Sequence, residues 1–119
     1  MITFYYNKYN SSSIQSEKWL KSHGIEAERK RVDSITSREL IHILSLTDNG
    51  FYDILKKSGS KTDTDTDLRK HSIQLMRFNE GVNYILENTD LLRSPIIFDE
   101  KKLIIGYNSD EIRVFLPKR

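Results

Sequence analysis

The residues of this chain that could do chemistry lie in a polar loop that leads into a helical pattern. Residues 10–13 read Asn-Ser-Ser-Ser, and four residues then follow at helical spacing: Ser16, Trp19, Leu20 and His23. Backbone N–H groups at a helix N-terminus can hold an anion, but Asn and Ser side chains commonly cap them instead. A serine nucleophile would need a neighbouring base, which this loop lacks. Two roles therefore stay open for the loop, helix capping and anion binding.

The 119 residues include no cysteine, which excludes thiol catalysis, disulfide switching and thiolate metal sites. The three histidines have no metal-ligand spacing, and no phosphate-binding loop or zinc-protease motif occurs. The paired carboxylates Asp99-Glu100 and Asp110-Glu111 fit a hairpin turn and a first helical turn, where acidic residues favour the helix dipole. We therefore predict no metal site and no cofactor.

Apolar periodicity predicts the elements that position these residues. In chain order they are a central strand at 2–6, the helix after the polar loop, a charged edge strand at 26–32, a capped helix at 36–47 and one or two helical turns at 51–57. Residues 59–67 (GSKTDTDTD) predict a mobile loop, since the Gly and terminal Glu of an EF-hand are absent. Further helices are expected at 68–76 and 79–88, the second slightly weakened by Gly81.

The last quarter of the chain predicts a strand, a turn, a second strand and a helix. Pro95 cannot sit inside a strand ladder but can open a strand, and residues 96–98 are apolar enough to form it. Four polar residues then lead to a second strand at 103–105. Asn108 offers a side-chain cap for a helix that Pro117 ends.

The amino-acid sequence of this quarter, LLRSPIIFDEKKLIIGYNSDEIRVFLP, resembles the Spx and arsenate reductase (ArsC) family, and within it Spx. The resemblance implies an α/β, thioredoxin-like fold with a mixed four-stranded sheet and an inserted helical subdomain. It implies one domain over 1–119, with a core at about 1–32 and 92–119 and a helical insertion at about 33–91. It also implies that the peptide bond before Pro95 is cis.

Aligned on Trp19-Leu20, the family's two redox cysteines fall on Asn10 and Ser13. Ser94 stands where an arsenate reductase has an arginine just before the cis-proline, and such arginines hold the oxyanion. The resemblance therefore argues against an enzyme.

Residues 47–50, Thr-Asp-Asn-Gly, resemble the Spx segment that meets the C-terminal domain of the RNA polymerase α subunit. The resemblance implies a partner-binding surface that includes Gly50, Asp48 and Asn49, although Ser45 replaces a basic residue expected in Spx. From the residues alone, Gly50 could equally supply the left-handed conformation of a turn between two helices.

Two functions follow as hypotheses. The first is a cytoplasmic, monomeric, Spx-like transcriptional regulator that binds the polymerase α subunit without a cysteine switch, meets DNA only through the polymerase and has no membrane role. The alternative is a degenerate member of the family that binds a small anion or a thiol compound beside Ser11 to Ser13 and Pro95. Direct DNA reading has little behind it, because the net charge is only +2 and the basic residues form short clusters: Arg29-Lys30-Arg31, Lys56-Lys57 and Lys118-Arg119.

Overall fold

The computed structural model describes residues 1–8, 10–56 and 64–117. The chain divides into two compact units, Met1–Ile35 with Ser94–Arg119, and Thr36–Arg93, which we call the core unit and the helical unit. The sequence predicted a core and an insertion with boundaries near residues 32 and 92, and their union in a single domain stays a prediction. No helix in the described ranges is long and apolar enough to cross a membrane.

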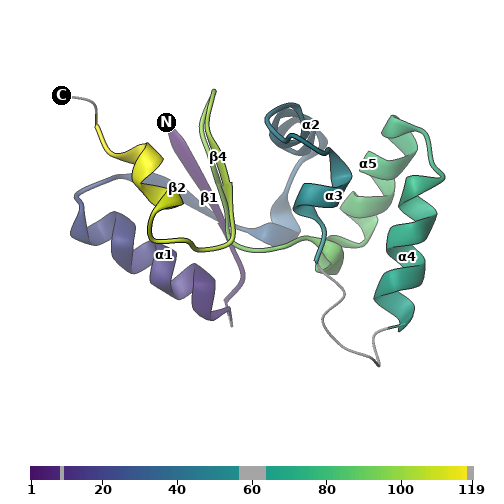
Figure 1. Ribbon diagram of the computed structural model, residues 1–119, viewed down its shortest axis with the longest axis horizontal. Helices are drawn as coiled ribbons and strands as arrows, with labels where there is room; N and C mark the ends of the chain where they lie inside the picture. The colour runs from purple at the N-terminus through teal and green to yellow at the C-terminus, as the bar shows by residue number, and fades with distance from the viewer. Residues whose placement is uncertain (9, 57–63, 118–119) are drawn as a thin grey trace. The chain divides into compact units, whose positions relative to one another are not determined.

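A mixed four-stranded sheet forms the centre of the core unit (Figure 1). In spatial order the strands are β2 (Ala27–Arg31), β1 (Ile2–Tyr6), β3 (Ile96–Phe98) and β4 (Leu103–Ile105). Strand β1 runs parallel to β2 and antiparallel to β3, and β3 runs antiparallel to β4. This order confirms the predicted thioredoxin-like α/β sheet, with the charged strand β2 at one edge.

One face of the sheet packs against the helix α1 (Ser11–Ser22) and the 3₁₀ helix η3 (Glu111–Phe115). The two helices meet the sheet through a buried apolar cluster: Phe4, Leu20, Ile97, Ile104, Ile112 and Phe115. Burying such side chains stabilises a fold by about 1.5 to 3 kcal/mol each. The cluster therefore fixes α1, and with it the polar loop before α1, on the sheet. A second 3₁₀ helix, η1 (Val32–Ser34), follows β2.

The last helix is a 3₁₀ helix, although the spacing of its apolar residues indicates an ordinary helix. The Asn108 side chain accepts hydrogen bonds from the N–H groups of Asp110 and Glu111, at 2.9 and 3.0 Å, so the predicted cap is present. Only five residues follow before Leu116 turns extended ahead of Pro117. A run this short closes with the tighter i→i+3 bonds common in short helices.

The helical unit contains α2 (Ser37–Ser45), α3 (Phe51–Ile54), α4 (Thr64–Gln74), α5 (Phe78–Glu87) and the 3₁₀ helix η2 (Thr89–Leu91) (Figure 1). Thr36 forms the predicted N-cap of α2, because its Oγ1 accepts a hydrogen bond from the Glu39 N–H at 3.2 Å. Apolar side chains from all four α-helices are buried in this unit, among them Leu40, Ile43, Ile54, Ile73 and Ile85.

Helix α4 begins at Thr64, so the predicted mobile loop was wrong for residues 64–67, while residues 59–63 lie outside the described ranges. Asp65 and Asp67 lie in the first turn of α4, where carboxylates favour the helix dipole. Asp65 also forms an ion pair with Arg69 at 3.1 Å, and Arg69 donates two hydrogen bonds to Asp90, at 3.1 and 2.7 Å. An i,i+4 ion pair thus accompanies the first turn of α4, in a sequence that looks like low complexity.

Candidate functional site

The loop before α1 is organised by its own side chains. Asn10 Oδ1 accepts a hydrogen bond from the Ser13 N–H at 2.9 Å, which is a helix N-cap. Ser13 Oγ accepts a hydrogen bond from the Asn7 N–H at 3.2 Å, and Ser13 is only 2% exposed. Both residues predicted to lie at the family's cysteine positions therefore make internal hydrogen bonds, which supports the capping role predicted from their residue types.

The peptide bond between Ser94 and Pro95 is cis. The Pro95 carbonyl accepts a hydrogen bond from the Gly106 N–H at 2.8 Å, which joins the start of β3 to the end of β4. Within the described ranges no hydrogen bond links residues 11–13 to Pro95. The predicted groove for an anion or a thiol compound was to be formed by residues 11–13 and Pro95. In the structure residues 11–13 belong to the capped start of α1, and Pro95 joins β3 to β4.

The segment that leads from α2 into α3, residues 47–53, is a second polar loop that includes the start of α3, and we call it the Gly50 turn. Thr47 Oγ1 accepts a hydrogen bond from the Gly50 N–H at 3.0 Å and donates one to the Leu44 carbonyl at 2.6 Å. The Asp53 carboxylate accepts hydrogen bonds from the backbone N–H groups of Asp48 and Asn49, at 3.1 and 3.0 Å. These four bonds fix the backbone on both sides of Gly50.

Gly50 has φ 63° and ψ −133°, a conformation that residues with a side chain rarely adopt. A Cβ added at Gly50 would meet no atom within 4 Å, so a side chain there would project into open space. Asp48 and Asn49 beside it are exposed. The turn therefore requires glycine for its backbone, and it also presents an open surface of the kind a partner could approach closely.

Asp53 is a residue of this turn to which the sequence analysis gave no role. The backbone N–H of Asn49 is the main cause that holds the pKa of the Asp53 carboxyl below its ordinary value, with help from the Asn49 side chain, the Asp48 N–H and the charge of Arg93. Partial burial opposes this shift. An acidic residue in the first turn of a short helix, three residues after a glycine, was the available signal.

A groove of about 300 Å³ adjoins the Gly50 turn within the helical unit. Its lining comes from the turn, α3, the residue after α3, and α4: Asn49, Phe51, Tyr52, Leu55, Lys70, Ile73 and Gln74. Leu55 and Ile73 are buried, whereas Tyr52 is 67% exposed. The groove therefore has an apolar floor and a polar rim, and sequence reasoning missed it because α3 and α4 meet only in the folded chain.

Gly81 of α5 lets Phe51 take its place beside this groove. A Cβ on Gly81 would lie 2.8 Å from Cζ of Phe51, closer than two such atoms can pack. The Phe51 ring also packs against Phe78, with ring centroids 5.6 Å apart. The glycine predicted to weaken α5 thus gives room to the residue that follows Gly50.

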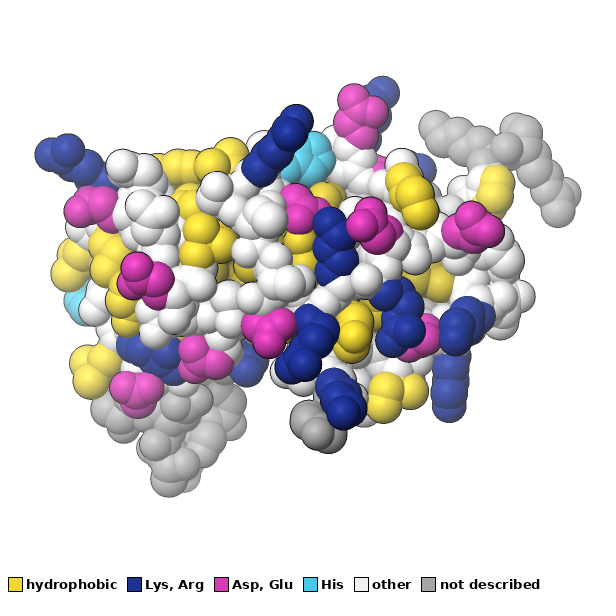
Figure 2. Space-filling view, turned by 180° about the vertical axis from the view of Figure 1, so that it is seen from behind, with side chains coloured by type: hydrophobic (Ala, Val, Ile, Leu, Met, Phe, Trp, Pro, Cys, Tyr) yellow, Lys and Arg dark blue, Asp and Glu magenta, His cyan; other side chains and the backbone are white. Residues whose placement is uncertain are grey.

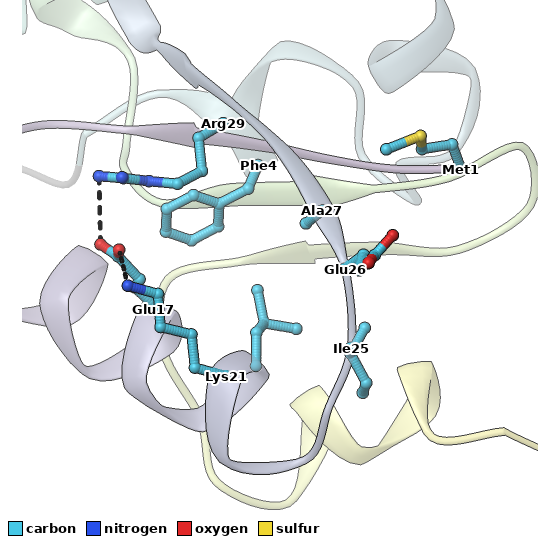
Figure 3. A pocket seen from close by; sticks show the side chains of 9 residues that line it. Met1, Phe4, Glu17, Lys21, Ile25, Glu26, Ala27 and Arg29 are labelled. Carbon is cyan, nitrogen blue, oxygen red and sulfur yellow. Dashed lines mark ion pairs between the residues drawn. The ribbon is translucent and has the colours of Figure 1, made fainter.

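A second cavity, of about 360 Å³, lies in the core unit between α1 and β2 (Figure 3). Phe4, Leu20 and Ile25 give it an apolar lining. At one end Glu17 lies between Lys21 and Arg29, with ion-pair distances of 3.0 and 3.2 Å. Glu17 pairs with both cations at this end, and Glu26 is a further acidic residue of the lining. The cavity therefore carries charges of both signs and does not favour a ligand of one charge.

The basic cluster at residues 29–31 is likewise neutralised. Arg29 pairs with Glu17, Lys30 with Glu28 at 3.6 Å and Arg31 with Asp33 at 3.4 Å. Lys and Arg side chains are interspersed with Asp and Glu side chains on the face shown in Figure 2. Lys57, Lys118 and Arg119 of the other predicted clusters lie outside the described residues. This pairing gives no support to direct DNA binding.

No cluster of His, Asp and Glu within the described ranges could hold a metal ion. The two geometries that remain for a site are the capped loop before α1 and the open Gly50 turn with its groove. The model of the ArsC family matches residues 5–115. The chain belongs to the ArsC family.

This ArsC-family chain is similar along almost its whole length to proteins named global transcriptional regulator Spx. The Spx of Streptococcus mutans is 35% identical over 123 aligned residues, which cover 99% of this chain and 85% of that protein. The Spx 2 of Bacillus cereus is 37% identical over 120 residues, covering 99% and 88%. The chain is therefore Spx-like within its family.

Solved structures share the fold at lower sequence identity. A solution structure of a Staphylococcus aureus protein superposes with a TM-score of 0.80 at 22% identity, covering 98% of this chain and 100% of that one. A possible arsenate reductase from Streptococcus mutans gives a TM-score of 0.74 at 17% identity, covering 92% of each chain. These likenesses show the thioredoxin-like ArsC fold alone, because one fold serves many functions.

Proposed function

We propose that this ArsC-family protein is a cytoplasmic, Spx-type regulator that binds the C-terminal domain of the RNA polymerase α subunit. The proposed contact surface is the Gly50 turn, with Asp48 and Asn49 beside Gly50. Its similarity to proteins named Spx over almost the whole chain supports this proposal. The protein meets DNA only through the polymerase.

The open space around Gly50 is the observation that carries the proposal. The turn is rigid, because Thr47 and Asp53 fix its backbone, and no atom fills the position that a side chain at residue 50 would occupy. A preformed surface of this kind binds a partner without the free-energy cost of ordering a loop.

The proposed regulator is not an enzyme and has no thiol switch. Arsenate reduction in this family needs a cysteine nucleophile, and the chain contains no cysteine. The residues at the two cysteine positions, Asn10 and Ser13, instead cap α1 and anchor the loop. The thiol oxidant diamide should therefore change neither the mass of the protein nor its affinity for the polymerase α domain, as mass spectrometry and titration calorimetry would show.

The test of the proposed function is calorimetric titration of the isolated C-terminal domain of the polymerase α subunit into the wild-type protein and into Gly50→Arg. Gly24→Arg is the matched control, because Gly24 also has a positive φ, 66°, and also has no atom within 4 Å of an added Cβ. Both variants carry the same new side chain at a glycine of positive φ. Circular dichroism establishes that each variant is folded.

Micromolar binding by the wild type and by Gly24→Arg, together with its loss in folded Gly50→Arg, is the expected result. Equal loss in both variants would assign the effect to backbone strain or added charge and remove the case for a Gly50 interface. No binding by the wild-type chain would end the proposal of a polymerase-binding regulator.

A further inference from the structure

The groove beside the Gly50 turn has the dimensions and lining of a socket for one apolar side chain. Its volume is about 300 Å³, at the lower end of the range of ligand pockets, and its floor is formed by the buried side chains of Leu55 and Ile73. Asn49 belongs both to the groove and to the Gly50 turn. A partner that covers the turn would therefore also cover the mouth of the groove.

Tyr52 stands at the rim of this groove with 67% of its surface exposed. Tyrosine is enriched among the few interface residues that carry most of the binding free energy, because it buries a large rigid ring with one polar end. It lies two residues after Gly50 in the chain. An exposed aromatic side chain so close to an open turn is a candidate anchor for a partner.

Lys70 supplies the charge of the groove. It is the ionisable cation among the described lining residues, and none of those residues carries a carboxylate. Its ammonium has no ion-pair partner within the described part of the chain. A carboxylate brought beside the groove would therefore meet an uncompensated positive charge.

We propose that the groove binds an apolar side chain of the polymerase α C-terminal domain, with a carboxylate of that domain paired to Lys70 and with Tyr52 packed over the contact. The inference rests on the proposed function and adds two determinants to the Gly50 turn. Gly50 allows close approach, the groove supplies apolar burial, and Lys70 selects an acidic neighbour of the inserted side chain. The three features lie on one unit, so a single partner surface can engage them together.

The experiment titrates the polymerase α C-terminal domain into the wild type and three variants on the groove. Tyr52→Ala removes the rim ring, Lys70→Glu reverses the charge, and Gln74→Phe fills the groove from its exposed edge. Lys101→Glu is the control for charge reversal, because Lys101 is an exposed residue of the β3–β4 turn in the core unit. Tyr52 and Gln74 are exposed and Lys70 is half-buried, so circular dichroism is used to establish folding.

The expected result is a loss of about tenfold or more in affinity for each groove variant, as for central interface residues, with Lys101→Glu within about twofold of the wild type. If the wild type binds and the three groove variants bind equally well, the groove inference is wrong and the proposed function stands. If Lys101→Glu loses as much affinity as Lys70→Glu, the effect is one of net charge and the pairing at Lys70 is wrong. If the wild type does not bind, the proposed function and the inference fail together.

Discussion

Two polar loops of this chain each lead into a helix. Comparing them distinguishes a loop whose polar side chains stabilise the fold from a turn that leaves a surface open to a partner. The resemblance predicts that the loop before α1 holds the positions of the family's cysteines, at Asn10 and Ser13. The Gly50 turn holds no residue with reactive chemistry. In both loops a side chain accepts hydrogen bonds from backbone N–H groups, Asn10 in the first and Asp53 in the second.

The loops differ in what they leave for another molecule. At Ser13 the side chain is buried and already accepts a hydrogen bond from the Asn7 N–H. At Gly50 the space outside the backbone is open, and beside it lies a groove lined by Lys70, a cation with no ion-pair partner among the described residues. The comparison shows that the polar side chains of the first loop are used within the fold, while the backbone at Gly50 leaves an accessible surface.

The largest expected effect comes from a side chain at Gly81, where the ring of Phe51 packs against α5. Gly81→Val places a branched side chain where an added Cβ alone would lie 2.8 Å from the Phe51 ring. Overpacking of this kind typically costs about 1 to 3 kcal/mol, and we expect about 2 kcal/mol here. Urea denaturation measures the loss in the free energy of unfolding.

Asn83→Val is the control for Gly81→Val, because residue 83 is exposed on the same helix. It introduces the same side chain and a similar helix propensity without the collision. Equal stabilities of the two variants would mean that α5 does not need glycine at residue 81, and that Phe51 can move aside at no cost.

The next largest effect is on the stability of the loop before α1, and it is measured by replacing two buried serines of α1 in turn. Ser13→Ala leaves the Asn7 N–H without its acceptor, and we expect a loss of about 1 to 2 kcal/mol in the free energy of unfolding. Ser16 is equally buried, but its hydroxyl has no hydrogen-bond partner in the described part of the chain. Ser16→Ala should therefore be neutral or slightly stabilising.

The pair of serine variants is measured by thermal and urea denaturation under one set of conditions. A stable Ser13→Ala would show that the buried hydroxyl does not anchor the loop before α1. The distinction between a capped loop and an open turn would then lose its energetic basis.

A smaller effect concerns pH, since, of the two loops, the Gly50 turn is the one held by a carboxylate. The folded state lowers the pKa of Asp53 from its ordinary value of 3.8, so its stabilising contribution is present above that value and is lost as the pH falls through the lower folded pKa. In two-dimensional NMR spectra the amide signals of Asp48 and Asn49 should shift below about pH 4. The Ser13 amide, which donates to the neutral Asn10 side chain, is the internal control and should not shift with them.

The smallest expected effect is that of small ligands on the loop before α1. Millimolar arsenate, phosphate or glutathione should leave the melting temperature unchanged, because the side chains of Asn10 and Ser13 already make internal hydrogen bonds. A rise of several degrees that Ser13→Ala abolishes would contradict this. It would restore the alternative in which the protein binds a small anion or a thiol compound.

Local patterns were enough to predict much of this molecule. The order of strands and helices, the caps at Thr36 and Asn108 and the edge position of β2 depend on neighbours within a few residues, so periodicity and residue type determine them. The start of α4 was missed, because Arg69 holds Asp65 and Asp90, and Asp90 lies far along the sequence. The role of Gly81 was missed for the same kind of reason, because Phe51 is distant in the sequence. The contacts of Asp53 with Asp48 and Asn49 are local, and the signal for them was overlooked.

By itself the sequence determined that no thiol chemistry is possible, since a missing cysteine cannot be replaced by folding. It also determined the family, because the motif around Pro95 and the Gly50 segment are local strings of residues. Only the tertiary structure decided which polar loop is closed and which is open. That difference depends on the burial of Ser13, on the contact of Gly81 with Phe51, and on the groove that Lys70 and Tyr52 line together. Such contacts between distant residues exist only once the chain has packed.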